Sequence, residues 1–204
     1  ASEHPLAMLP APLSDDAFKL SRWSTAETLV VLDSAGEAQP ALSTKWQPIN
    51  DTTWRFELRP DVRVHDDSTL TAQVVANALN VAANATPKPR ILDGVKLTAK
   101  AEGDSTVLVT TANKDALLPH RLSSPQLAIL SLDAYKEKSV VDPVNTGTGP
   151  FILRRVDGTS SASLDRFEGY WGEKAKASGI DASFVPDGTA RAAAARQVGM
   201  AVST

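Results

Sequence analysis

In the first half of the chain, a segment in which apolar side chains recur every two residues is followed by one in which they recur every three or four. This change of spacing constrains the fold more than any other feature of the sequence. Over residues 53–58 apolar and polar side chains alternate, as they do in a half-buried strand. Over residues 74–83 the apolar side chains recur three and four positions apart, which is the spacing of an amphipathic helix. We therefore predict a strand followed by a helix that packs on it.

The predicted helix has signals for both of its ends. Thr69 and Thr71 each stand where a hydroxyl can cap a helix N-terminus. Pro87 and Pro89 are expected to end the helix, because proline has no N–H to donate. The preceding loop, residues 65–68, contains a histidine and two aspartates, and we interpret it as a capping turn rather than as a metal site or an acid–base pair.

The remaining elements are short, and several of them form hairpins. Turn residues separate apolar runs that are typical of antiparallel strands, and no regular alternation of strands and helices indicates a simple Rossmann fold. The sequence predicts an α/β fold with mixed sheets. The expected elements are a first strand over 27–32, hairpins of 95–99 with 106–110 and of 151–156 with 163–167, a short helix over 115–122, a strand over 182–185 and a helix over 189–198.

Composition excludes several classes of protein. The 204 residues are 42% hydrophobic and 22% charged, so the chain can bury a core. A net charge of −3 gives no field that would concentrate nucleic acid. No run of about 18 apolar residues could span a bilayer, and we expect any export signal to have been removed already. The absence of cysteine excludes disulfides, thiolate metal sites and a cysteine nucleophile.

No motif for catalysis or for metal binding is present in the sequence. The segment Gly147-Thr148-Gly149-Pro150 lacks the third glycine of a dinucleotide loop and the lysine of a phosphate loop, so we interpret it as a tight turn that uses positive φ angles of glycine. The three histidines have no ligand spacing and are expected on loops or on helix surfaces; they are His4, His65 and His120. We expect no catalytic residue, no metal site built by the protein and no cofactor.

Aromatic and cationic side chains supply the first candidates for a binding cleft. Arg22 and Trp23 stand in an irregular stretch, residues 1–26, where a cation and an indole can line a cleft. Tyr170 and Trp171 could stack on a ligand, although large aromatic side chains more often close a core, which is the role we expect for them.

Three widely spaced segments resemble the peptide- and nickel-binding proteins that serve ABC importers. Their order and spacing, across about residues 27 to 199, make the resemblance specific. The segments are Glu27-Thr28-Leu29-Val30 continuing to Trp46, then Trp54-Arg55-Phe56-Glu57-Leu58-Arg59-Pro60-Asp61-Val62-Arg63-Val64-His65-Asp66, and finally Gly147-Thr148-Gly149-Pro150-Phe151 with Tyr170-Trp171-Gly172.

This resemblance implies a fold like that of type II periplasmic binding proteins, in which two lobes close around a ligand by hinge motion. Residues 1–204 would form the N-terminal lobe, with the second lobe absent, and we expect such a piece to bind its solute weakly or not at all. The resemblance also implies a monomer outside the cytoplasmic membrane, either periplasmic or lipid-anchored. It would capture a small peptide or similar solute for an ABC permease, without acting as an enzyme.

Departures from the nickel-binding branch leave the solute open. That branch carries an aromatic residue near Arg90 and an arginine near Ser124 and Gln126, and both are missing here. By position alone, Arg90, Ser124 and Gln126 are candidate ligand-binding residues. Uptake of a nickel chelate stays an alternative to peptide uptake, and a sensory or interaction domain that reuses the fold is an alternative of another class.

Overall fold

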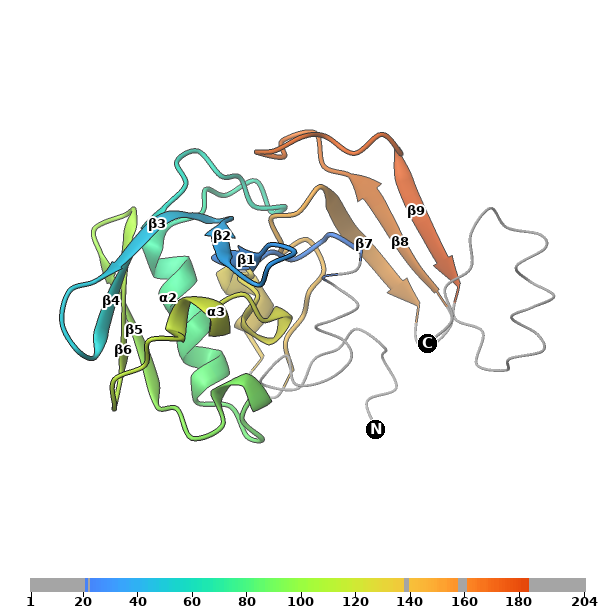
Figure 1. The fold of residues 1–204 in the computed structure, drawn as a ribbon. Coiled ribbons are helices and arrows are strands. Elements are labelled where there is room, and N and C mark those ends of the chain that lie inside the picture. Colours follow the sequence, from blue (N-terminus) through green and yellow to red (C-terminus); the bar gives the residue numbers. More distant parts are fainter. Residues whose placement is uncertain (1–20, 22, 138–139, 158–160, 184–204) are drawn as a thin grey trace.

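A four-stranded antiparallel sheet with one long helix on its face forms the larger part of the fold (Figure 1). The computed structural model describes residues 21, 23–137, 140–157 and 161–183. The strands lie in the order β3 (Ser43–Pro48), β4 (Thr53–Leu58), β6 (Thr106–Thr111) and β5 (Leu97–Glu102). Phe56, from the alternating segment, is fully buried between the sheet and helix α2 (Ala72–Ala83). The predicted packing of strand and helix is therefore confirmed.

Helix α2 begins at a threonine cap. The Thr71 hydroxyl accepts a hydrogen bond from the amide of Val74 at 3.4 Å, so Thr71 rather than Thr69 is the cap. The helix ends at Ala83, before Pro87. The expectation that the loop over 65–68 caps the helix is wrong, because its Asp66 carboxylate accepts its hydrogen bond from the backbone of Ser68 at 3.0 Å, within the loop.

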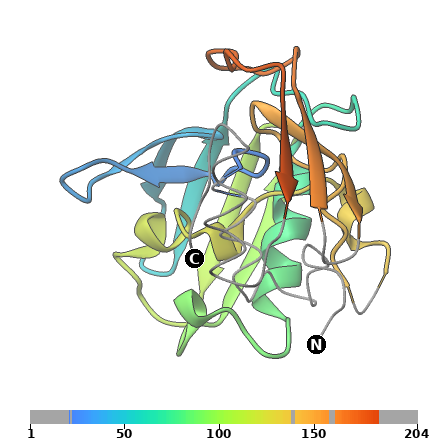
Figure 2. The ribbon, with the colours of Figure 1, turned by 90° about the vertical axis from the view of Figure 1, so that its right-hand side faces the viewer.

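A second sheet of three antiparallel strands lies beside the first body. It contains β7 (Phe151–Asp157), β8 (Ser161–Arg166) and β9 (Gly179–Ser183), and Figure 2 shows these strands side by side. A separate hairpin pairs β1 (Val30–Leu32) with β2 (Ala38–Pro40). Both hairpins expected from the turn residues are confirmed.

Several element boundaries differ from the predictions. The first strand covers only Val30–Leu32, because Glu27 forms an isolated bridge with Ile129. The helix expected over 115–122 shortens to α3 (Leu118–Arg121), and β9 begins at Gly179. The helix predicted over 189–198 lies outside the described residues.

Three single-turn 3-10 helices complete the described part of the chain: η1 (Arg90–Leu92), η2 (Pro125–Leu127) and η3 (Leu132–Tyr135). Two clusters of buried apolar side chains support the fold, one around α2 and the four-stranded sheet and one under the three-stranded sheet. Within the described residues, no helix is both long and apolar enough to cross a membrane.

Candidate functional site

A groove of about 590 Å³ lies where β1, η1, α3 and η2 meet, and it is the candidate site. We call it the η1–α3 groove. Its lining is mainly apolar and comes from segments that are far apart in the sequence: Val31, Leu32, Ile91, Leu117, His120, Arg121, Ser123, Ser124 and Pro125.

Exposed apolar side chains are concentrated at this groove. Val31 is 45% exposed, Leu32 46% and Leu117 58%. They are three of the five exposed large hydrophobic residues found in the part of the chain that the structure describes. Apolar surface gathered around a hollow is typical of a place that contacts a ligand or partner.

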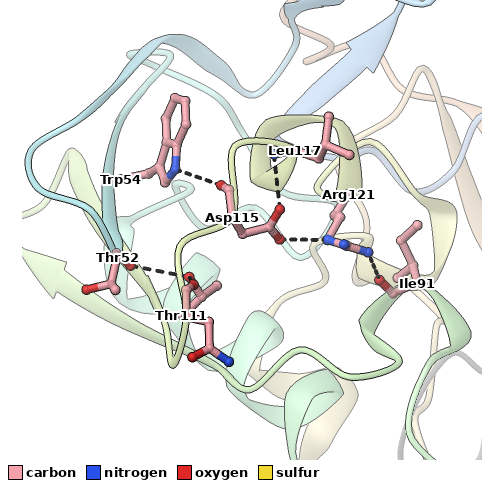
Figure 3. Close-up of polar contacts among 8 residues, drawn as sticks. Thr52, Trp54, Ile91, Thr111, Asp115, Leu117 and Arg121 are labelled. Carbon is pink, nitrogen blue, oxygen red and sulfur yellow. Dashed lines mark hydrogen bonds and ion pairs between the residues drawn. The ribbon is translucent and has the colours of Figure 1, made fainter.

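An ion pair fixes the shape of the groove (Figure 3). The Asp115 carboxylate accepts hydrogen bonds from Arg121 Nε at 2.7 Å and from the backbone amide of Leu117 at 3.0 Å. Arg121 also donates from Nη1 to the carbonyl of Ile91 at 2.9 Å. The partly buried Arg121 therefore connects α3 to η1 and holds both sides of the groove.

The same loop is connected to the four-stranded sheet. Trp54 Nε1 donates to the backbone carbonyl of Asp115 at 3.2 Å (Figure 3). The Thr111 hydroxyl donates to the carbonyl of Asn113, in the same loop, at 2.7 Å. The alternating strand thus supports the loop that leads into α3.

Three of the residues predicted by position lie together near this groove. Ser124 lines it, and its hydroxyl accepts from the amide of Gln126 at 3.3 Å. Gln126 is buried, and its Oε1 accepts from the amide of Ile91 at 3.3 Å, so its side chain braces η1 against η2. Arg90 is exposed at the start of η1, next to the groove. Their part in ligand binding stays a prediction.

The two other predicted residues are Arg22 and Trp23, and Arg22 lies outside the described residues. Trp23 is half-buried and packs against the cluster under the three-stranded sheet. Sequence reasoning missed Leu117, His120 and Arg121. The sequence held one signal that a leucine here is exposed. Leu117 and Leu118 are adjacent on a short helix, so both cannot face the protein core, and only Leu118 does.

The motif residues meet at a second place, which we call the Glu27 cluster: Glu27, Thr148, Tyr170 and Trp171. The Glu27 carboxylate accepts hydrogen bonds from the Tyr170 hydroxyl at 2.7 Å, the Thr148 hydroxyl at 2.7 Å and Trp171 Nε1 at 2.9 Å. The Arg59 guanidinium stacks 4.1 Å from the Trp171 ring centre. Each of these donors already has its acceptor, so the cluster connects segments and offers little to a ligand.

Burial governs the acid–base properties of this cluster. Burial raises the pKa of Glu27, while the hydrogen bonds from Trp171, Tyr170 and Thr148 oppose that rise. Burial also raises the pKa of Tyr170, and the neighbouring carboxylate adds to the increase. Trp171 packs against the main apolar cluster, as expected for a residue that closes a core.

The histidine and glycine motifs also meet. His65 lies in a loop, as expected, but it is buried, and its Nε2 lies 2.8 Å from the carbonyl oxygen of Gly149. The expectation for the glycines is wrong, because Gly147 and Gly149 have no positive φ. They are glycines because a Cβ would lie 1.9 Å from the Thr25 oxygen and 2.1 Å from the Ser24 oxygen, respectively.

Metal ligands do not gather in the part of the chain that the structure describes. No group of three or more His, Cys, Asp or Glu side chains there could hold a metal ion. The groove contributes one imidazole and no carboxylate to such a set.

An antiparallel sheet covered by one helix, with a second sheet beside it, is a mixed α/β fold of the type II periplasmic-binding class, and solved structures show the same fold. NikA from Brucella suis in complex with Fe(III)-EDTA aligns with a TM-score of 0.80 at 23% identity, covering 98% of this chain and 40% of that one. DppA from Helicobacter pylori in complex with the peptide STSA aligns with a TM-score of 0.74 at 22% identity, covering 94% and 43%.

The family follows from the sequence match. Residues 37–203 match the bacterial extracellular solute-binding proteins, family 5 Middle, and the chain belongs to this family. The nickel-binding protein NikA of Staphylococcus aureus is 29% identical over 170 residues, which are 81% of this chain and 33% of that protein. The chain thus spans about a third of the length of this curated relative.

Proposed function

We propose that the chain is part of the substrate-binding component of an ABC importer. It would capture a small peptide or similar solute outside the membrane and deliver it to the permease, as a monomer and without chemistry on the solute. Membership of an extracellular solute-binding family supports the class of function. The observation that carries the proposal for this chain is the η1–α3 groove, where exposed apolar side chains line a hollow.

The groove is a better candidate for the solute wall than the Glu27 cluster. In the cluster, the carboxylate already accepts three hydrogen bonds, from Thr148, Tyr170 and Trp171. A ligand there would have to displace bonds that hold the fold. In the groove, Leu117 and Val31 leave apolar surface in contact with water, and a ligand would gain by covering it.

Uptake of a nickel chelate is the second candidate, because a relative is a nickel-binding protein. A metal that arrives with its own chelator needs no cluster of metal ligands from the protein, and the described residues hold none. The mainly apolar lining of the η1–α3 groove, with one imidazole and no carboxylate, supports the peptide as the first candidate.

Native mass spectrometry of the protein, purified from the extracytoplasmic fraction at the length that its gene encodes, tests the proposal. We expect one small solute that is bound without a covalent bond and is released unchanged on denaturation. A solute with the isotope pattern of nickel would favour the second candidate. Recovery of the protein only from the cytoplasm, or conversion of the solute to a product, would contradict the proposal.

A further inference from the structure

We propose that the η1–α3 groove receives an uncharged, apolar group of the solute and that His120 donates a hydrogen bond to an acceptor beside that group. This inference rests on the proposed function, since it concerns the class of group that the same groove binds. It goes beyond that function because it predicts that the groove binds solutes with a neutral apolar group and does not bind solutes that present a carboxylate there.

The charge balance of the groove is the first argument. Among the described residues, Arg121 is the single charged one in the lining of the groove. Its guanidinium is paired with Asp115 at 2.7 Å and also donates to the Ile91 carbonyl at 2.9 Å. A carboxylate that entered the groove would lose water and find this cation already neutralised, which is unfavourable for an anion.

The apolar surface is the second argument. Val31 and Leu32 come from one side of the groove and Leu117 from another, and each is close to half exposed or more. Covering these side chains with an apolar group removes hydrocarbon surface from water without the need for an ionic partner. A neutral aliphatic or aromatic group therefore suits this lining better than a carboxylate does.

The imidazole of His120 supplies the polar contact. Its Nδ1 is buried and has no hydrogen-bond partner among the described residues. We assign the ring proton to Nε2, because a proton on Nδ1 would be a buried N–H without an acceptor. The neighbouring Ser123 hydroxyl is already used, because it donates to the His120 carbonyl at 2.7 Å. His120 Nε2 is thus the donor that we assign to the solute.

Nuclear magnetic resonance with two small probes tests this inference on the protein at the length that its gene encodes. N-acetyl-L-leucinamide is uncharged, apolar and rich in carbonyl acceptors, whereas citrate presents carboxylates. We expect N-acetyl-L-leucinamide to shift the backbone amides of Leu117 and Ser124 saturably, and citrate to leave them unchanged. His120→Phe should weaken binding of N-acetyl-L-leucinamide about threefold to tenfold, the loss expected for one hydrogen bond.

A matched pair of leucine variants locates the effect. Leu117→Asp places a charge in the groove and should weaken binding at least about tenfold, since a buried charge without a partner is costly. Leu132→Asp changes a leucine that is 49% exposed outside the groove lining and should have no effect. If Leu117→Asp fails to fold, as judged by its amide spectrum, Leu117→Gln replaces it with the same expected direction.

The outcomes separate the inference from the proposed function. Stronger shifts of the Leu117 and Ser124 amides with citrate than with N-acetyl-L-leucinamide would overturn the inference and leave the groove as the solute wall. Equal losses for Leu117→Asp and Leu132→Asp would overturn it as well. No response of these amides to either probe would count against the groove as the solute wall, and so against the proposed function at this site.

Discussion

Gly147 shows how a single residue fixes the contact between distant segments. A Cβ at this position would lie 1.9 Å from the Thr25 carbonyl oxygen, a backbone atom that cannot rotate away. The Thr25 backbone therefore approaches the glycine motif only because the motif has no side chain there.

Gly147→Ala should lower the free energy of unfolding by about 3 kcal/mol, because the backbone must separate to admit the methyl group. Gly36→Ala is the control. Gly36 has φ +79° but nothing within 4 Å of a built Cβ, so its loss should be about 1 kcal/mol, from backbone strain alone. Urea denaturation measures both values, and equal losses would contradict the close-approach explanation.

His65 makes the stability of the fold dependent on pH. Burial lowers the pKa of His65 from 6.5 to about 4, although its hydrogen bond with Gly149 opposes this shift. Between these two values the unfolded chain binds a proton that the folded chain does not bind. Stability contributed by neutral His65 is therefore present above pH 6.5 and is lost as the pH falls toward 4.

His65→Gln should reduce this pH dependence, because glutamine can still donate to Gly149 but does not titrate. We expect the decrease in unfolding free energy between pH 6.5 and 4 to be smaller than in the unmodified chain, by up to about 3 kcal/mol. Urea denaturation at a series of pH values measures it. Parallel curves for the two proteins would show that His65 does not carry the effect.

At the scale of elements, capping decides where α2 begins. The sequence left Thr69 and Thr71 as alternatives, because both precede the amphipathic spacing. Only Thr71 accepts a hydrogen bond from the first turn, at the amide of Val74. Thr69 instead pairs through an isolated bridge with Arg63.

Thr71→Ala should cost about 1 kcal/mol of unfolding free energy, the usual value for the loss of a helix cap. Thr69→Ala should cost less than about 0.5 kcal/mol, as is usual for an exposed position. Thermal and urea denaturation of the two variants give the comparison. A larger loss for Thr69→Ala would contradict the assignment of the cap.

Elements with a strong local pattern were predictable from the sequence, and elements set by distant contacts were not. The alternation around Phe56 predicted β4 with its observed bounds. In contrast, β1 is shorter than predicted because Glu27 pairs with Ile129, which is about 100 residues away in the sequence. The groove was predicted only in part, since Arg121 reaches it through a contact with η1 that local spacing does not encode.

At the scale of the whole molecule, the Glu27 cluster connects parts of the fold that pack on different apolar clusters. Glu27 adjoins Ala26, in the cluster under the three-stranded sheet, whereas its partner Trp171 packs against the main cluster. The motif residues of the Glu27 cluster therefore stabilise the fold, while most residues of the solute site that we propose lie outside the motifs.

Glu27→Gln should destabilise the fold by about 2 kcal/mol, because the new amide group replaces an acceptor with a donor facing other donors. Glu37→Gln is the control, since Glu37 is exposed, and it should change the unfolding free energy by less than about 0.5 kcal/mol. Urea denaturation above pH 7 measures both changes. A loss no larger than that of the control would mean that the cluster does not hold the fold together.

A crystal structure of the protein with the solute it retains tests the central claim most directly, that the η1–α3 groove is a wall of the solute site. We predict that an uncharged, apolar group of the solute lies against Leu117 and Val31, with an acceptor within hydrogen-bonding distance of His120 Nε2. A solute bound elsewhere, with the groove filled only by water, would contradict the claim.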